Sequence, residues 1–188
     1  MKTINLLAIL LLIGTLSASA QKSEIDLSKS QVLWTGKKIG GSHNGKIQIQ
    51  SGSFELKNGE IVSGNVVIDM NSLTNDDLKD AGYNKQLVDH LKSDDFFGVN
   101  NHPTATFKIT RAGKFNSDKA LVTGLLTIKG KTEKVSFVVN RKGNVYSTQL
   151  KVDRSKFGVR YGSKSFFNNL GDKVIDDMFT LDIKLVLK

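Results

Sequence analysis

The sequence predicts an all-β domain, a small antiparallel barrel of about eight strands with one short helical insertion. The clearest strand is Phe179–Leu187, where apolar and polar residues alternate as they must in a strand with one buried face. About eight such segments are separated by turns rich in glycine and asparagine, and a small up-and-down barrel closes with eight strands. Only one interval has helical periodicity, and no linker divides the chain.

The strand candidates in the first part of the chain are Gln31–Gly36, Lys46–Leu56 and Glu60–Met70. A flexible turn region at residues 40–45 connects the first two, because glycine and asparagine tolerate positive φ angles. The alternation changes phase near Ser51-Gly52, which predicts a β-bulge or bend. Asn58-Gly59 is a strong hairpin signal, since a type I′ turn needs two positive φ angles.

The helical insertion is expected to start at Asn84, which can cap a helix, and to end near Ser93. Leu87, Val88 and Leu91 share one face of that helix. Pro103 cannot donate to a sheet ladder and therefore marks the start of a strand. The strand candidates that follow are Thr104–Arg111, Ala120–Ile128, Glu133–Val139, Tyr146–Val152 and Phe179–Leu187.

The segment 154–178, before the last strand, is irregular and contains both aromatic and basic residues. A long connection of this kind inside a compact domain is usually functional. We interpret it as the rim of a pocket, with the last strand as part of the pocket wall.

The N-terminus has the pattern of a secretory signal peptide over residues 1–20. Lys2 precedes an apolar run, Ile4–Leu16, and Ala18-Ser19-Ala20 supplies small residues for signal peptidase, so cleavage is expected before Gln21. The run is short for a bilayer span, so a retained transmembrane anchor is the weaker interpretation. We expect a periplasmic mature protein, residues 21–188, that forms one barrel domain.

The chain has no cysteine, which excludes disulfides, thiolate metal sites and cysteine nucleophiles. Its formal charge of +9 becomes +8 when Lys2 leaves with the signal peptide. Positive charge attracts anionic partners such as lipid headgroups, surface polysaccharide or nucleic acid, and export argues against nucleic acid. The alternative is that dispersed lysines simply keep an exported domain soluble.

Five stretches together form a specific signature that covers nearly the whole mature chain. They are Ile68–Ser72, His90–Phe97, Pro103–Phe107, Gly124–Thr132 and Asp153–Gly162. In their order and spacing they resemble the YceI-like family of periplasmic lipid-binding proteins. The resemblance implies a lipocalin-like antiparallel barrel. It also implies a long apolar pore that holds a polyisoprenoid, an isoprenoid quinone, or another amphiphile such as a fatty amide.

The candidate ligand-binding residues are aromatic or basic: Phe96, Phe97, Phe157, Tyr161, Phe166, Phe167, Arg160 and Lys164. Aromatic rings supply apolar area for a lipid tail, and tyrosine adds a polar group at a wet edge. Arg160 and Lys164 can meet a polar or anionic head. Phe96 and Phe97 fit equally well as ordinary core that plugs a barrel end. For Arg154, a salt bridge to Asp153, Asp172 or Asp176 is the favoured interpretation.

No metal is expected, because the three histidines have no metal-binding spacing and no cysteine completes a site. No catalytic residue is expected, because the sequence has no Gly-x-Ser-x-Gly elbow, and no cofactor is expected. The leading hypothesis is a binding or carrier protein whose partner is a lipophilic small molecule. One alternative is a module whose basic surface binds anionic envelope polymer. A weaker one is a hydrolase or isomerase that uses His90 with Asp94 or Asp95. A homodimer through strand edges or the barrel mouth also stays open.

Overall fold

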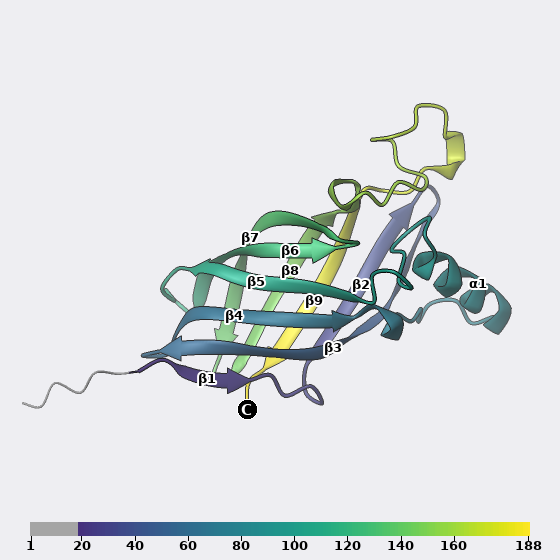
Figure 1. Ribbon diagram of the computed structural model, residues 1–188. Helices are drawn as coiled ribbons and strands as arrows, with labels where there is room; N and C mark the ends of the chain where they lie inside the picture. The colour runs from purple at the N-terminus through teal and green to yellow at the C-terminus, as the bar shows by residue number, and fades with distance from the viewer. Residues whose placement is uncertain (1–18) are drawn as a thin grey trace, which may run out of the picture.

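The computed structural model describes residues 19–188, so the predicted signal peptide lies outside the described residues except for its last two. The described chain is mostly β and forms a closed, eight-stranded antiparallel barrel with one α-helix, which confirms the predicted fold class (Figure 1). Within residues 19–188, no helix is both long and apolar enough to cross a membrane.

The eight barrel strands follow the order β3-β2-β9-β8-β7-β6-β5-β4, and β4 pairs with β3 to close the ring. They are β2 (Gln31–Lys38), β3 (Gly41–Lys57), β4 (Glu60–Asp69), β5 (Thr104–Ala112), β6 (Lys119–Ile128), β7 (Lys131–Lys142), β8 (Val145–Asp153) and β9 (Met178–Val186). A further strand that the sequence did not predict, β1 (Gln21–Glu24), pairs with the second half of β3, beyond the residues of β3 that pair with β2.

Two local predictions about β3 are confirmed. Asn58 and Gly59 have φ angles of 54° and 77°, as the turn between β3 and β4 requires. A register shift between Ile49 and Ser51 places the bulge of β3 beside the predicted position.

The predicted turn region at residues 40–45 is too wide, because β3 already begins at Gly41. Gly45 lies within the strand, where a Cβ atom would come 1.9 Å from the carbonyl oxygen of Thr74. That oxygen accepts a hydrogen bond from the Trp34 indole at 2.9 Å. Gly45 therefore makes room for a crossing segment rather than for a turn.

The helix α1 (Ala81–Lys92) begins earlier than predicted, because Asp80 rather than Asn84 caps it. The Asp80 carboxylate accepts the backbone N–H of Tyr83 at 2.9 Å. The Asn84 amide instead donates to the carbonyls of Asn75 and Leu78, which ties the helix to the preceding loop.

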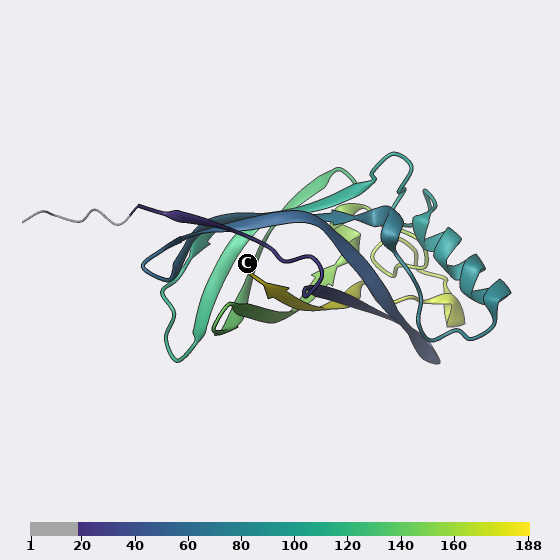
Figure 2. The same cartoon turned by 90° about the horizontal axis from the view of Figure 1, so that it is seen from below.

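The two ends of the barrel differ (Figures 1 and 2). At one end, which we call the helical end, α1 lies near the long connection 154–177 between β8 and β9. This connection contains two short 3-10 turns, η2 (Arg154–Phe157) and η3 (Gly171–Lys173), and a third, η1 (Met70–Ser72), follows β4. The hairpins β3–β4, β5–β6 and β7–β8 turn at the opposite end, the hairpin end.

The barrel wall is least continuous between β7 and β8. Their ladder contains only the pairs of Asn140–Lys142 with Val145–Ser147, whereas β6–β7 and β8–β9 are paired along nearly their whole length. Beyond the last pair, the Thr148 hydroxyl donates to the Val138 carbonyl at 2.8 Å. In the described chain, β7 and β8 form no further ladder pairs from there toward the helical end.

Candidate ligand-binding site

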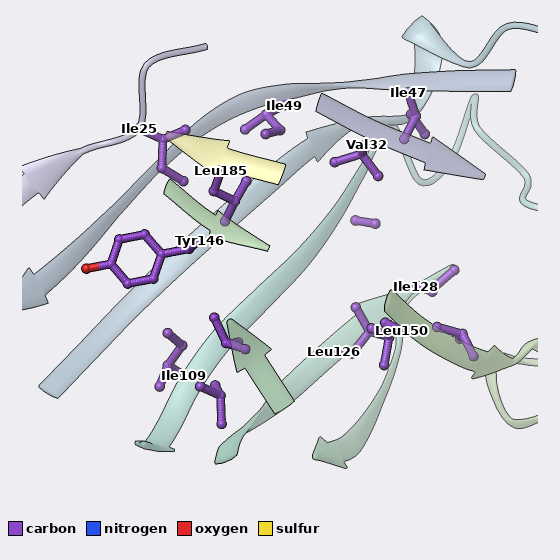
Figure 3. Close-up of a cluster of buried hydrophobic side chains, with 14 of the residues drawn as sticks. Ile25, Val32, Ile47, Ile49, Ile109, Leu126, Ile128, Tyr146, Leu150 and Leu185 are labelled. Atoms are coloured by element: carbon purple, nitrogen blue, oxygen red, sulfur yellow. The ribbon is translucent and has the colours of Figure 1, made fainter. Parts of the chain in front are cut away.

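The barrel encloses a cavity with a volume of about 390 Å³. All eight ring strands contribute inward-facing apolar side chains, among them Val32, Ile47, Ile68, Phe107, Leu126, Phe137, Leu150 and Leu181. Figure 3 shows several of these side chains converging from different strands. Protein interiors contain few voids larger than a water molecule, whereas ligand pockets occupy roughly 300–1,000 Å³. The size and lining of the cavity therefore suit an apolar ligand.

Charged side chains and histidines line the cavity only at the helical end. They are Lys37, Lys38, His43, His90, Arg154 and Asp176. His43 Nδ1 lies 2.8 Å from Asp77 Oδ2. Burial alone would raise the pKa of Asp77. Hydrogen bonds from the Asn44 N–H, His43 and Asn75 outweigh burial and hold this pKa below its usual range. The cavity thus has an apolar interior and one charged end, a division that fits an amphiphile.

A cluster of three rings joins α1 to the long connection at the helical end. The His90 ring meets the rings of Phe96 and Tyr161 edge-on, with centroids 5.0 Å and 4.5 Å apart. Phe96 and Tyr161 are themselves 5.4 Å apart. Phe97 extends the cluster toward the wall, where its ring meets Phe179 of β9 at 6.3 Å. These five rings all line the cavity: His90, Phe96, Phe97, Tyr161 and Phe179. Together they form an aromatic cover over the helical end of the cavity.

Arg154 is the buried anchor of the long connection, with only 3% of its surface exposed. Its guanidinium donates to the backbone carbonyls of Asp176, Val159, Tyr161 and Ile175 at 2.8–3.1 Å. Its ion-pair partner is Asp177, 3.4 Å away, rather than any of the three carboxylates considered from the sequence. Burial lowers the pKa of Arg154, and neighbouring carboxylates oppose this shift. The arginine holds both halves of the connection in place over the cavity.

We expect the helical end to lose stability in acid. Burial works against ionisation of Asp177, but hydrogen bonds from Ser163 and Ser165 and the charge of Arg154 hold its pKa below the usual range. Such a carboxylate stabilises the fold above its unfolded pKa, about 4, and the contribution disappears as the pH falls through the folded pKa. Thermal melts at decreasing pH should show this loss, with a smaller pH dependence in Asp177→Asn. Equal pH dependence in both proteins would contradict the assignment.

The structure separates the eight candidate residues into three groups. Phe96, Phe97 and Tyr161 line the cavity. Phe157, only 2% exposed, packs in the core of the barrel and is not part of the lining. The other four, Arg160, Lys164, Phe166 and Phe167, are exposed outside the cavity. The Arg160 guanidinium there lies 4.8 Å and 5.9 Å from the two phenylalanine ring centroids. Ligand contact by any of the eight stays a prediction.

Sequence reasoning missed the polar residues that β2 and β3 bring to the helical end. Lys37, Lys38 and His43 flank the turn between these strands and all line the cavity. The adjacent lysines at a turn were a usable signal, but their position beside the connection 154–177, where Lys38 pairs with Ile175, depends on closure of the barrel. Most of the apolar lining was also missed, because alternation alone does not show which face of each strand points inward.

Comparison with known proteins gives consistent matches over the described barrel. The profile of the YceI-like domain matches residues 24–187. A UPF0312 protein of Pseudomonas aeruginosa is 40% identical over 84 residues, which are 45% of this chain and 40% of the relative, less than half of its length. The crystal structure of BcnA from Burkholderia cenocepacia is 26% identical, with a TM-score of 0.66, and the match covers 87% of this chain and 99% of that chain.

Two further solved structures show the same fold at lower identity. A polyisoprenoid-binding domain from Saccharophagus degradans, implicated in plant cell wall breakdown, is 16% identical with a TM-score of 0.58 over 90% of this chain and 99% of that chain. A YceI protein of Campylobacter jejuni is 18% identical with a TM-score of 0.53 over 100% of this chain and 99% of that chain. At these identities the likeness concerns the fold alone.

Proposed function

The chain belongs to the YceI-like domain family, and from this premise we propose that it is a binding or carrier protein for one elongated amphiphile. The apolar tail lies in the barrel cavity, and the polar head lies at the helical end. A polyisoprenoid, an isoprenoid quinone and a fatty amide are the ligand classes that fit this division. The predicted signal peptide supports a periplasmic location for the carrier.

The observation that carries this proposal is the cavity itself, with its apolar walls and its charged residues confined to one end. Burial of apolar surface contributes about 25 cal/mol per Å², so a long tail enclosed on all sides supplies most of the affinity. The head adds specificity through a few polar contacts, as is usual in small-molecule sites. The Saccharophagus degradans domain, described as polyisoprenoid-binding, has the same fold and supports this choice of ligand class.

We further propose that the protein carries out no chemistry on its ligand. His90 lines the cavity, and its Nε2 lies 3.5 Å from Asp95 Oδ2, so the pair considered for catalysis is adjacent to the site. However, the His90 ring is packed between Phe96 and Tyr161, a position that suits a structural part of the cover. An offered ligand should therefore be recovered chemically unchanged after prolonged incubation. Conversion of the ligand by the wild type but not by His90→Gln would contradict this.

The alternative function is a basic module that binds anionic envelope polymer, favoured by the positive charge of the chain. The two functions differ in their response to salt. We expect isoprenoid alcohols and fatty amides to displace an apolar fluorophore from the mature protein with nearly the same affinity at low and high ionic strength. Charge-driven binding to a polymer would instead weaken strongly as salt is added. Failure of all apolar ligands to displace the fluorophore, with salt-sensitive polymer binding, would favour the alternative.

A further inference from the structure

Three buried side chains close the cavity at the hairpin end. Phe54, Ile61 and Tyr146 all line the cavity and are 5%, 4% and 4% exposed. The Tyr146 ring meets Phe54 edge-on, with centroids 5.4 Å apart. Phe115 also packs against Tyr146, at 6.1 Å, but does not line the cavity, so it lies behind this surface. We call Phe54, Ile61 and Tyr146 the floor.

Tyr146 projects toward the hairpin end rather than across the middle of the barrel. In Figure 3 its hydroxyl points away from Leu126, Ile128 and Leu150, which lie farther along the cavity. Replacing the tyrosine side chain by the methyl group of alanine would therefore lengthen the cavity. Removing the hydroxyl alone would leave the face that the ring presents to the cavity unchanged.

Hydrogen bonds between the three hairpins hold the floor in place. Arg141 Nη1 donates to the Gly59 carbonyl at 2.5 Å, and the Arg141 N–H donates to the Asp118 carbonyl at 2.8 Å. The Arg141 guanidinium also lies 3.9 Å from the Phe115 ring centroid. The Phe115 N–H in turn donates to Glu60 Oε2 at 2.8 Å. The floor is thus supported from behind by a connected set of contacts.

The floor is closely packed where Phe54 meets β4. A Cβ atom at Gly64 would lie 2.7 Å from Phe54 Cδ1 and 3.1 Å from Ile109 Cδ1, so the glycine is what admits the Phe54 ring. The charged lining residues all lie at the helical end, so a tail whose head binds on that side would extend toward Tyr146.

We propose that the floor, and Tyr146 above all, sets the longest apolar tail that the protein can enclose. This inference rests on the proposed function, since it concerns the ligand of the same cavity. Tails shorter than the distance from the helical end to Tyr146 gain affinity with each added carbon. Longer tails must leave the additional carbons in water at the helical end, where they contribute no further affinity.

The test is a series of straight-chain primary alcohols, lengthened by one methylene at a time, that displace an apolar fluorophore from the mature protein. Each methylene buried in the cavity should raise the affinity roughly fourfold. The rise should stop at one chain length, which marks contact with the floor. A rise that continues without a break through the whole series would overturn the proposal.

The break is the chain length at which the affinity stops rising. Three variants test which residues set it. Tyr146→Ala should move the break to longer alcohols, Ile61→Phe should move it to shorter ones, and Tyr146→Phe should leave it at the wild-type length. Because Tyr146→Ala removes a large buried side chain, thermal melts accompany it, and Ile61→Phe tests the same boundary by adding volume. A break at the wild-type length in both Tyr146→Ala and Ile61→Phe would overturn the assignment. Absence of any alcohol binding to the wild type would instead defeat the proposed function, and this inference with it.

Discussion

Replacing Ile183 with glutamate is expected to lower the affinity for an apolar tail by roughly a hundredfold or more. Ile183 lies on β9, pairs with Val32 and Thr148, and lines the cavity. Without ligand, the introduced carboxylate can be hydrated inside the cavity. A bound tail removes that water, and stripping an unpaired carboxylate of its water costs several kcal/mol, of which about 3 kcal/mol corresponds to a hundredfold.

The neighbouring residue supplies the control, because Lys184 faces outward on the same strand and is exposed. Lys184→Glu should leave tail affinity unchanged although it changes the net charge more than Ile183→Glu does. The effect of Ile183→Glu should also diminish as the pH falls, because an apolar site raises the pKa of a carboxyl group and protonation removes the charge. Equal binding by both variants and the wild type would show that the tail does not pass Ile183.

Removal of Arg154 is the second change with a large expected effect, this time on stability. Arg154→Ala leaves the carbonyls of Asp176, Val159, Tyr161 and Ile175 without their donor and leaves the Asp177 carboxylate without its charged partner. Removal of one partner of a buried ion pair lowers the free energy of unfolding by about 3–5 kcal/mol. Arg154→Lys should recover little of this, because an ammonium group cannot present several donors in a planar fork.

Urea denaturation of the purified proteins measures this difference directly. Arg160→Ala is the matched control, since Arg160 is exposed and only lies over Phe166 and Phe167, and surface changes usually stay within about 0.5 kcal/mol. If Arg154→Ala were as stable as Arg160→Ala, the anchoring role of Arg154 would be wrong.

The sequence predicted those parts of the fold that are decided locally. Alternation identified β9, and the Asn58-Gly59 pair identified the turn after β3, because each depends on neighbouring residues only. Gly45 resembled a turn residue, yet its small size serves a contact with Thr74, which is remote in sequence. The pairing of β1 with β3 is likewise a long-range choice that no local pattern expresses.

The candidate site shows the same difference: features set by neighbouring residues could be predicted, and features set by long-range contacts could not. Phe96 and Phe97 were identified because they follow a helix in a recognisable stretch, and both line the cavity. Within the long connection, four aromatic residues looked equivalent, but only Tyr161 faces the cavity. The hydrogen bonds of Arg154 to carbonyls along this segment fix its path, and with it which rings point inward. Residue types alone do not contain that information.

Native mass spectrometry of the mature protein, purified from an envelope fraction and then extracted with solvent, tests the central claim most directly. The proposed carrier function predicts a bound species of fixed mass that extracts as an isoprenoid or another amphiphile. A protein that is free of ligand, and that takes up no offered quinone or polyprenyl phosphate, would contradict it.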